Sequence, residues 1–273
     1  MSSTRTLAGV ELSKQLWRLR TYLALGVTAL VPVLITIAFA LGGTSHHHHG
    51  HVGFFSVATR SGLDMPLAAL SAMEGFLLIV VVALFAGESV AGEASWGTLR
   101  YLLVRPVRRS RLLAAKLSVA ALLSLVATLV LVIVALAAGT AAFGWHPVVT
   151  PFGLVMPEGQ AIIRLAVSAI YVAWSMAGVV SFAFLLSTLT DSAFGAVAGG
   201  VALGVVSEIL DGIPAFGAVR YGLPSHYWQA WNGLFVDPVR YADMVRGAII
   251  QVVYAGAFCA LAWWRFSRKD ITS

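Results

Sequence analysis

The sequence predicts an all-α membrane protein with six transmembrane helices, and three observations support this class. Hydrophobic residues make up 59% of the chain and charged residues only 11%, whereas a soluble domain carries roughly 25% charged residues. Six apolar runs reach or approach the ~20 residues that a spanning helix needs. Basic residues gather beside alternate runs, which is typical of the cytoplasmic side of a multi-pass protein.

The apolar runs form one membrane domain, residues 1–273. We expect spans at about residues 22–41, 65–90, 113–143, 162–190, 192–210 and 245–264. The second run contains Glu74 and, near its cytoplasmic end, Glu88, and the fifth is short and rich in glycine. Glu208 and Asp211 mark the end of the fifth run, and six spans place both termini on one side.

The distribution of Lys and Arg predicts the orientation. Thirteen of them lie in the N-terminal segment, around the loop between the second and third runs and in the C-terminal tail, against five on the other side. Both termini are therefore expected to be cytoplasmic. Arginine outnumbers lysine fifteen to three, which suits a GC-rich bacterial genome and a location in the bacterial plasma (inner) membrane. The net charge of +6 does not indicate a nucleic-acid partner, because the basic residues adjoin apolar runs.

Two further segments are predicted to contact membrane lipid. Residues 10–23 have leucines at helical spacing with charged residues opposite, namely Leu12, Leu16, Leu19 and Leu23 against Glu11, Lys14 and Arg18. This pattern predicts an amphipathic interfacial helix; the alternative is the start of the first span. In the loop at 211–241, "PSHYWQAWNGLF" predicts a short interfacial helix with its rings toward lipid, namely Tyr227, Trp228, Trp231 and Phe235.

The most polar stretch is "GEASWGTLRYLLVRPVRRSRLLAAK", residues 92–116, between the second and third runs. Its apolar residues recur at steps of three and four, which predicts a short helix with one apolar face: Trp96, Leu99, Leu102 and Leu103. Pro106 ends that helix. An apolar face on a short cytoplasmic helix needs a partner, either the bilayer surface or a groove in a protein.

This stretch resembles the E-x-x-x-G-T-L … P-x-x-R … K signature of ABC-2 type transporter permeases. The residues that carry the resemblance are Glu93, Gly97, Thr98, Leu99, Pro106, Arg109 and Lys116. Arg108 departs from the pattern, since a small polar residue is common there. The amphipathic start, the six spans, the chain length and the basic tail extend the resemblance over essentially the whole chain.

The resemblance implies a permease that pairs with a second copy or a homologue and with two copies of an ABC ATPase subunit. The segment between the second and third spans would be a cytoplasmic coupling helix that docks on the ATPase. The coupling residues implied are Glu93, Trp96, Gly97, Thr98, Leu99, Arg100, Leu102, Leu103, Pro106 and Arg109. This chain would bind no cofactor, and ATP and Mg²⁺ would bind to the partner ATPase.

The sequence also indicates that a separate polypeptide hydrolyses ATP. A P-loop needs the pattern G-x-x-x-x-G-K-[ST], and none of the three lysines, Lys14, Lys116 and Lys269, follows a glycine. An enzyme is not expected either. Ser175 and Ser181 lie in the fourth run whereas His146 and His226 lie in predicted loops, and no H-E-x-x-H occurs.

Three other groups are candidate sites. Glu74 lies ~13 Å into the second run by helical rise and either lines the substrate pathway, binds a proton or cation, or sits near the outer interface. The small-x-x-x-small pairs of the fifth run predict close helix packing: Gly195, Gly199, Gly200 and Gly204. The histidine tract at 46–51 lacks cysteines and has few nearby carboxylates, so no metal site is expected; its candidates are His46, His47, His48, His49 and His51.

The function expected from these features is ATP-driven export of an amphiphilic drug-like or lipidic substrate, with direction and cargo taken from family analogy. Two alternatives stay open. One is an ion-coupled secondary transporter that works through Glu74, which would require broken helices and an inverted repeat. The other is an ABC permease linked to copper handling through the histidine tract.

Overall fold

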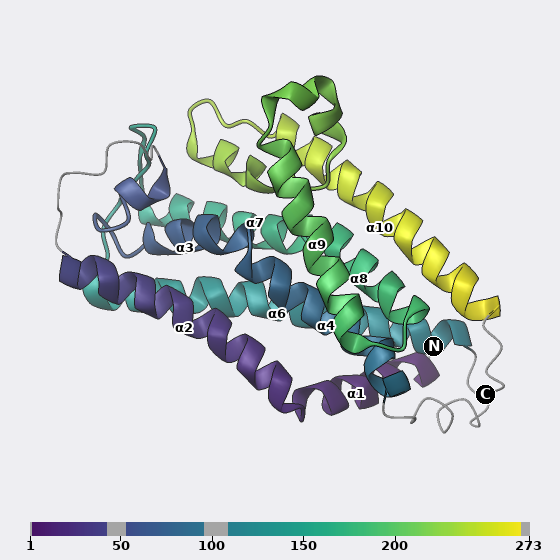
Figure 1. Ribbon diagram of the computed structural model, residues 1–273. Coiled ribbons are helices and arrows are strands. Elements are labelled where there is room, and N and C mark those ends of the chain that lie inside the picture. The colour runs from purple at the N-terminus through teal and green to yellow at the C-terminus, as the bar shows by residue number, and fades with distance from the viewer. Residues whose placement is uncertain (1, 43–52, 96–108, 269–273) are drawn as a thin grey trace.

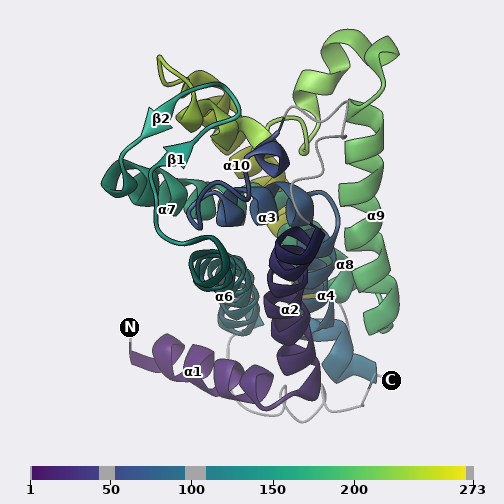
Figure 2. The same ribbon diagram turned by 90° about the vertical axis from the view of Figure 1, so that its left-hand side faces the viewer.

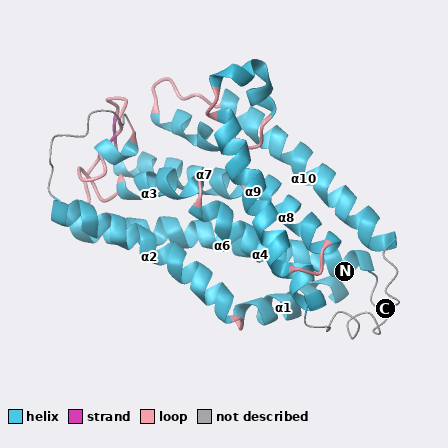
Figure 3. Ribbon diagram, in the orientation of Figure 1, coloured by secondary structure: helices cyan, strands magenta, loops and turns pink. Residues whose placement is uncertain are grey.

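The computed structural model describes residues 2–42, 53–95 and 109–268, and helices dominate this part of the chain (Figures 1 and 3). Five helical segments are long and apolar enough to cross a membrane. They are α2 (Leu19–Gly42), α6 (Arg109–Phe143), α7 (Glu158–Ser175) continued by α8 (Ala177–Leu189), α9 (Ala193–Asp211) and α10 (Ala242–Arg268). These segments agree within a few residues with five of the apolar runs.

The second apolar run forms two helices instead of one. α3 (Met65–Glu74) and α4 (Leu77–Ser95) meet at a bend of 61° and count as a sixth span if taken together. The break falls on Gly75 and Phe76, directly after Glu74. Glycine favours such a break, because it costs about 1 kcal/mol relative to alanine inside a helix. The run of apolar residues predicted the span but not its bend.

α4 lies at the centre of the bundle and contacts α6, α8 and α9. Its sequence is apolar on every side over most of its length, which is typical of a buried helix. Leu78, Ile79, Val82, Ala83 and Ala86 are all buried. α2 packs on α6 at one side of α4, and α10 packs on α8 at the other.

The last turn of α10 lies at one end of the bundle, which we call the terminal end (Figure 1). α1 (Ser2–Leu16), the last turn of α4 and the first turn of α6 are also there. Figure 2 looks along α6 and shows α1 lying across it.

The opposite end, which we call the loop end, carries shorter elements: η1 (Phe54–Ser56), the antiparallel pair β1 (Val148–Val149) and β2 (Val155–Met156), η2 (Pro214–Gly222) and η3 (Trp228–Phe235).

The N-terminal helix differs from the expectation of one helix over residues 10–23. α1 ends at Leu16 and α2 begins at Leu19, so the four leucines do not share one helix. Glu11, expected on the exposed face, is instead buried, and so is Gln15. α1 therefore turns a polar face toward the bundle, and the reason is a buried charge on α6.

The aromatic residues of η3 also differ from the expectation. Trp228, Trp231 and Phe235 are buried within the chain and do not face lipid. Phe54 of η1 stacks on Trp231 and meets Phe235 edge-on, both at 5.4 Å between ring centroids. These ring contacts hold η3 against η1.

Candidate functional site

The predicted coupling segment lies largely outside the described residues. This applies to Trp96, Gly97, Thr98, Leu99, Arg100, Leu102, Leu103 and Pro106, as it does to His46, His47, His48, His49 and His51. The structure does describe both flanks of the coupling segment. Glu93 lies in the last turn of α4, and α6 begins at Arg109.

Lys116 of α6 is the centre of an ion cluster at the terminal end. Its Nζ atom lies 2.9 Å from Glu11 Oε1 of α1 and 2.9 Å from Glu93 Oε2 of α4. It also donates a hydrogen bond of 2.8 Å to the carbonyl oxygen of Ser89. Lys116 is only 2% exposed and each glutamate 5%. One buried ammonium group thus joins three helices.

The cluster extends to the surface through two further cations. Lys14 Nζ lies 3.8 Å from Glu93 Oε1. Arg20, in the first turn of α2, forms an ion pair with Glu88 of α4. The last part of α4 is tied to α8 as well, because the Ser187 hydroxyl accepts hydrogen bonds from the amides of Val90 and Ala91.

This arrangement explains why α1 presents a polar face to the bundle. A buried lysine needs charged partners and hydrogen bonds, because the free-energy cost of desolvating an isolated charge is large. Glu93 supplies one carboxylate and Glu11 the second. Glu93 and Lys116 stand at the two ends of the quoted signature, and the structure brings these ends together. The sequence carried no comparable signal for Glu11.

Glu74 is the second notable group. It is the last residue of α3, is 1% exposed and lies at the break in the span. Trp231 Nε1 of η3 donates a hydrogen bond of 3.0 Å to Oε2. Oε1 accepts no hydrogen bond from any described residue. Glu74 therefore lies well inside the protein.

A chain of polar groups runs from Glu74 toward the loop end. The Glu208 carboxylate of α9 reaches over the break, since a Cβ atom added to Gly75 would lie 3.4 Å from its Oε2. One turn further, Asp211 contacts the His226 imidazole and lies 3.5 Å from Nε of Arg220. The residues around His226 line a cavity of about 310 Å³.

Asp64, just before α3, is a further buried carboxylate. Burial raises its pKa from 3.8 to about 7, although the backbone amide of Val149 and the positive charge of Arg60 oppose this shift. Neither carboxylate oxygen makes a hydrogen bond of good geometry to a described residue. Asp64 thus titrates near neutral pH.

The glycines of α9 occupy different environments. A Cβ atom on Gly200 would lie 2.6 Å from Ala183 Cβ and 3.1 Å from Ala83 Cβ, and one on Gly204 would lie 2.7 Å from Ile79. Gly199 meets Leu186 of α8. Gly195 instead faces Ser192, the N-cap residue of α9, whose hydroxyl accepts a hydrogen bond from the Gly195 amide. α9 is thus held close to α4 and α8 at three of its glycines, Gly199, Gly200 and Gly204.

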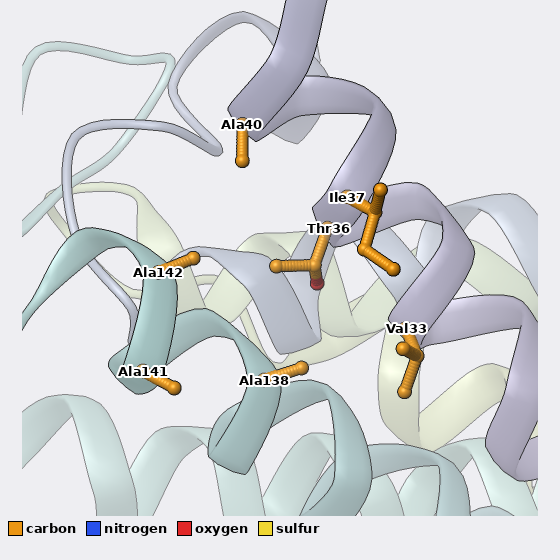
Figure 4. Close-up of a pocket in the computed structure, with 7 residues that line it drawn as sticks. All are labelled: Val33, Thr36, Ile37, Ala40, Ala138, Ala141 and Ala142. Carbon is orange, nitrogen blue, oxygen red and sulfur yellow. The ribbon is translucent and has the colours of Figure 1, made fainter.

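Other candidate sites are sparse in the part of the chain that the structure describes. No group of three or more His, Cys, Asp or Glu there could hold a metal ion. An apolar groove of about 250 Å³ lies between α2 and α6 (Figure 4) and is lined by Val33, Thr36, Ile37, Ala40, Ala138, Ala141 and Ala142. The Thr36 hydroxyl donates to the Pro32 carbonyl, so the groove suits hydrocarbon better than a polar ligand.

Comparison with known proteins identifies a family. No curated protein matches the sequence. The family described as "Protein of unknown function (DUF2705)" matches residues 30–272, a range that includes Glu74, Glu93 and Lys116 and begins after Glu11. Because this match covers most of the sequence, the chain belongs to the DUF2705 family.

Proposed function

We propose that this chain is the permease subunit of an ATP-driven ABC transporter of the ABC-2 type in a bacterial plasma membrane. In this proposal the terminal end is cytoplasmic and the loop end faces outward. The chain pairs with a second permease, and each permease binds one ATPase subunit. The cargo is an amphiphilic drug-like or lipidic molecule that is exported.

The observation that carries the proposal is the Lys116 cluster. It closes the base of the segment at 94–115, which contains the expected ATPase-docking face, by joining Glu93 to Lys116. The same ammonium group holds Glu11 of α1. A displacement of this segment by an ATPase would therefore be passed to α4, α6 and α1 together. A solvated loop that only connects two spans would need no buried ion cluster at its base.

Three further features support the same function. The helices long enough to span a membrane follow the order expected of this type of permease, with the candidate docking segment between the second and third spans. α1 lies across α6 at the terminal end (Figure 2), as an interfacial helix would. ATP and Mg²⁺ would be bound by the partner ATPase, since the sequence has no P-loop.

The test is co-purification of the full chain with the ATPase encoded beside it. We expect a complex of two permeases and two ATPases by native mass, with ATP hydrolysis that depends on the permease. Leu99→Asp with Leu102→Asp should release the ATPase, because charged groups would replace the expected apolar docking face. Phe216→Asp with Val219→Asp, which changes two exposed residues of η2 at the loop end, is the matched control and should keep the complex. A permease that binds no ATPase would refute the proposal.

One observation favours the ion-coupled alternative. A span broken beside a buried carboxylate is typical of secondary transporters, and α3 and α4 meet in this way at Glu74. This alternative requires ion-dependent uptake by liposomes that contain the chain alone. Uptake that is abolished by Glu74→Gln and needs no ATPase would replace the proposed function with this one.

A further inference from the structure

The environment of Glu74 is unlike that of the other buried carboxylates at the terminal end. Glu11 and Glu93 each lie 2.9 Å from an ammonium group. Among the described residues, Glu74 has no cation within ion-pair distance, and its single hydrogen bond comes from Trp231. A carboxylate accepts up to about four hydrogen bonds when it is ionised, so most of the acceptor capacity of Glu74 is unused.

Three elements near Glu74, namely α9, α7 and η3, supply polar groups that act on it. α9 brings Glu208, whose negative charge opposes that of Glu74, and α7 brings Tyr171 and Ser175. Tyr171 donates its hydroxyl proton to the Tyr227 carbonyl oxygen at 2.7 Å. Ser175 donates to the Val172 carbonyl oxygen at 2.8 Å. In this geometry both hydroxyl protons are directed at backbone carbonyl oxygens, and η3 supplies the indole of Trp231.

These groups suit a neutral carboxylic acid. A protonated Glu74 carries no charge, and its Oε2 atom would still accept the hydrogen bond from Trp231. An ionised Glu74 would leave Oε1 buried without a donor, at a free-energy cost that is larger for a charged group than for a neutral one.

We propose that Glu74 is a proton-binding site built into the break between α3 and α4, and that protons reach it from the loop end past Glu208. The route is short. Glu208 is half-buried on α9, its carboxylate lies over Gly75 next to Glu74, and Asp211 with His226 follows one turn nearer to the loop end. Each step moves one proton between oxygen or nitrogen atoms, directly or through water.

Proton binding has a structural consequence at η3. The Trp231 indole donates a charge-assisted hydrogen bond when Glu74 is ionised and a weaker neutral one when it is protonated. Trp231 is also held by its stacking on Phe54. The state of Glu74 thus alters how firmly η3 is tied to the broken span, at the end of the bundle where substrate would leave in the proposed function.

The test is infrared difference spectroscopy on the full chain in liposomes, because a buried carboxylic acid has a carbonyl band separate from that of carboxylate. All spectra are recorded in the Asp64→Asn background, because Asp64 also holds a proton up to about pH 7. We expect the band near neutral pH in this background and its loss when Glu74→Gln is added. Glu158→Gln is the matched control, since it removes a carboxyl in the first turn of α7 near the loop end, and it should keep the band. A band that persists in Glu74→Gln would overturn the proposal.

Two variants test the route and the indole. Trp231→Phe removes the donor that favours the ionised form, so the acid band should persist to a pH about one unit higher. Glu208→Gln should keep the band but slow its shift when the liposomes are moved to D₂O. An unchanged pH range in Trp231→Phe, or an unchanged exchange rate in Glu208→Gln, would overturn the role of that residue. Loss of the band on adding Na⁺ at constant pH would mean that a metal cation occupies the site, which would overturn the proton assignment.

This inference is independent of the driving force. Its measurements use the chain without an ATPase, and the co-purification test does not depend on Glu74. Failure of either proposal therefore leaves the other standing.

Discussion

Replacement of Lys116 by methionine tests the ion cluster most directly. The change keeps the length of the side chain and removes the ammonium group that contacts Glu11, Glu93 and the Ser89 carbonyl oxygen. Two carboxylates, each 5% exposed, would then be buried close together without their shared cation. Breaking a buried ion pair from one side costs about 3–5 kcal/mol of unfolding free energy. Lys14 partly offsets the loss at Glu93, so we expect a value near the lower limit.

Three matched variants separate this mechanism from a general packing defect. Lys14→Met removes a cation whose side chain is 43% exposed and 3.8 Å from Glu93, so it should cost below about 1 kcal/mol. Glu11→Gln leaves Lys116 its contacts with Glu93 and Ser89 and should cost about 2 kcal/mol. The triple variant Lys116→Met, Glu11→Gln, Glu93→Gln removes the unbalanced charge and should recover most of the loss.

The assay is reversible unfolding of the purified chain in mixed micelles, with helix content followed by circular dichroism while the denaturing detergent is increased. Non-additivity between Lys116→Met and Glu11→Gln measures their coupling free energy. A cost below about 1 kcal/mol for Lys116→Met would refute the argument. Equal costs for Lys116→Met and Lys14→Met would do the same, and so would a triple variant that is no more stable than Lys116→Met alone.

Three other predictions concern separate parts of the molecule. Burial raises the pKa of Asp64 from 3.8 to about 7, so between these pH values the folded state holds a proton that the unfolded chain has lost. The free energy of unfolding should therefore fall as pH rises from about 4 to 7, by at most on the order of 4 kcal/mol. Asp64→Asn should reduce this pH dependence in unfolding curves recorded at pH 5 and pH 8, and an unchanged pH dependence would contradict the assignment. Gly200→Val should lower the free energy of unfolding by about 1–3 kcal/mol, because the new side chain would overlap Ala183 and Ala83. Gly195→Ala is the control: the only side chain near Gly195 is that of the N-cap residue Ser192, so this change should have little effect in the same assay. Replacing His46, His47, His48 and His49 by Ser should leave transport by reconstituted complexes unchanged with or without added Cu²⁺ or Zn²⁺, and a metal-dependent loss would favour the copper-handling alternative.

The sequence by itself determined where helices long and apolar enough to cross a membrane occur. This is possible because the length and polarity of a run are local properties. The bounds of α2, α6, α9 and α10 therefore agree closely with the predicted runs. The same local reasoning found Glu74 inside the second run and singled out Glu93 and Lys116 within one patterned stretch.

Only the tertiary structure decided which of these residues meet. Glu11 has a charged neighbourhood in the sequence and was expected to face solvent, but it is buried because Lys116, 105 residues away, comes within 2.9 Å of it. Trp231 is typical of an interfacial ring, yet it is buried because Phe54 and Glu74 contact it. The bend at Gly75 likewise depends on what packs on each side of it. The apolar pattern of a helix indicates how much of its surface must be buried. Which element covers that surface depends on contacts between residues that are distant in the sequence.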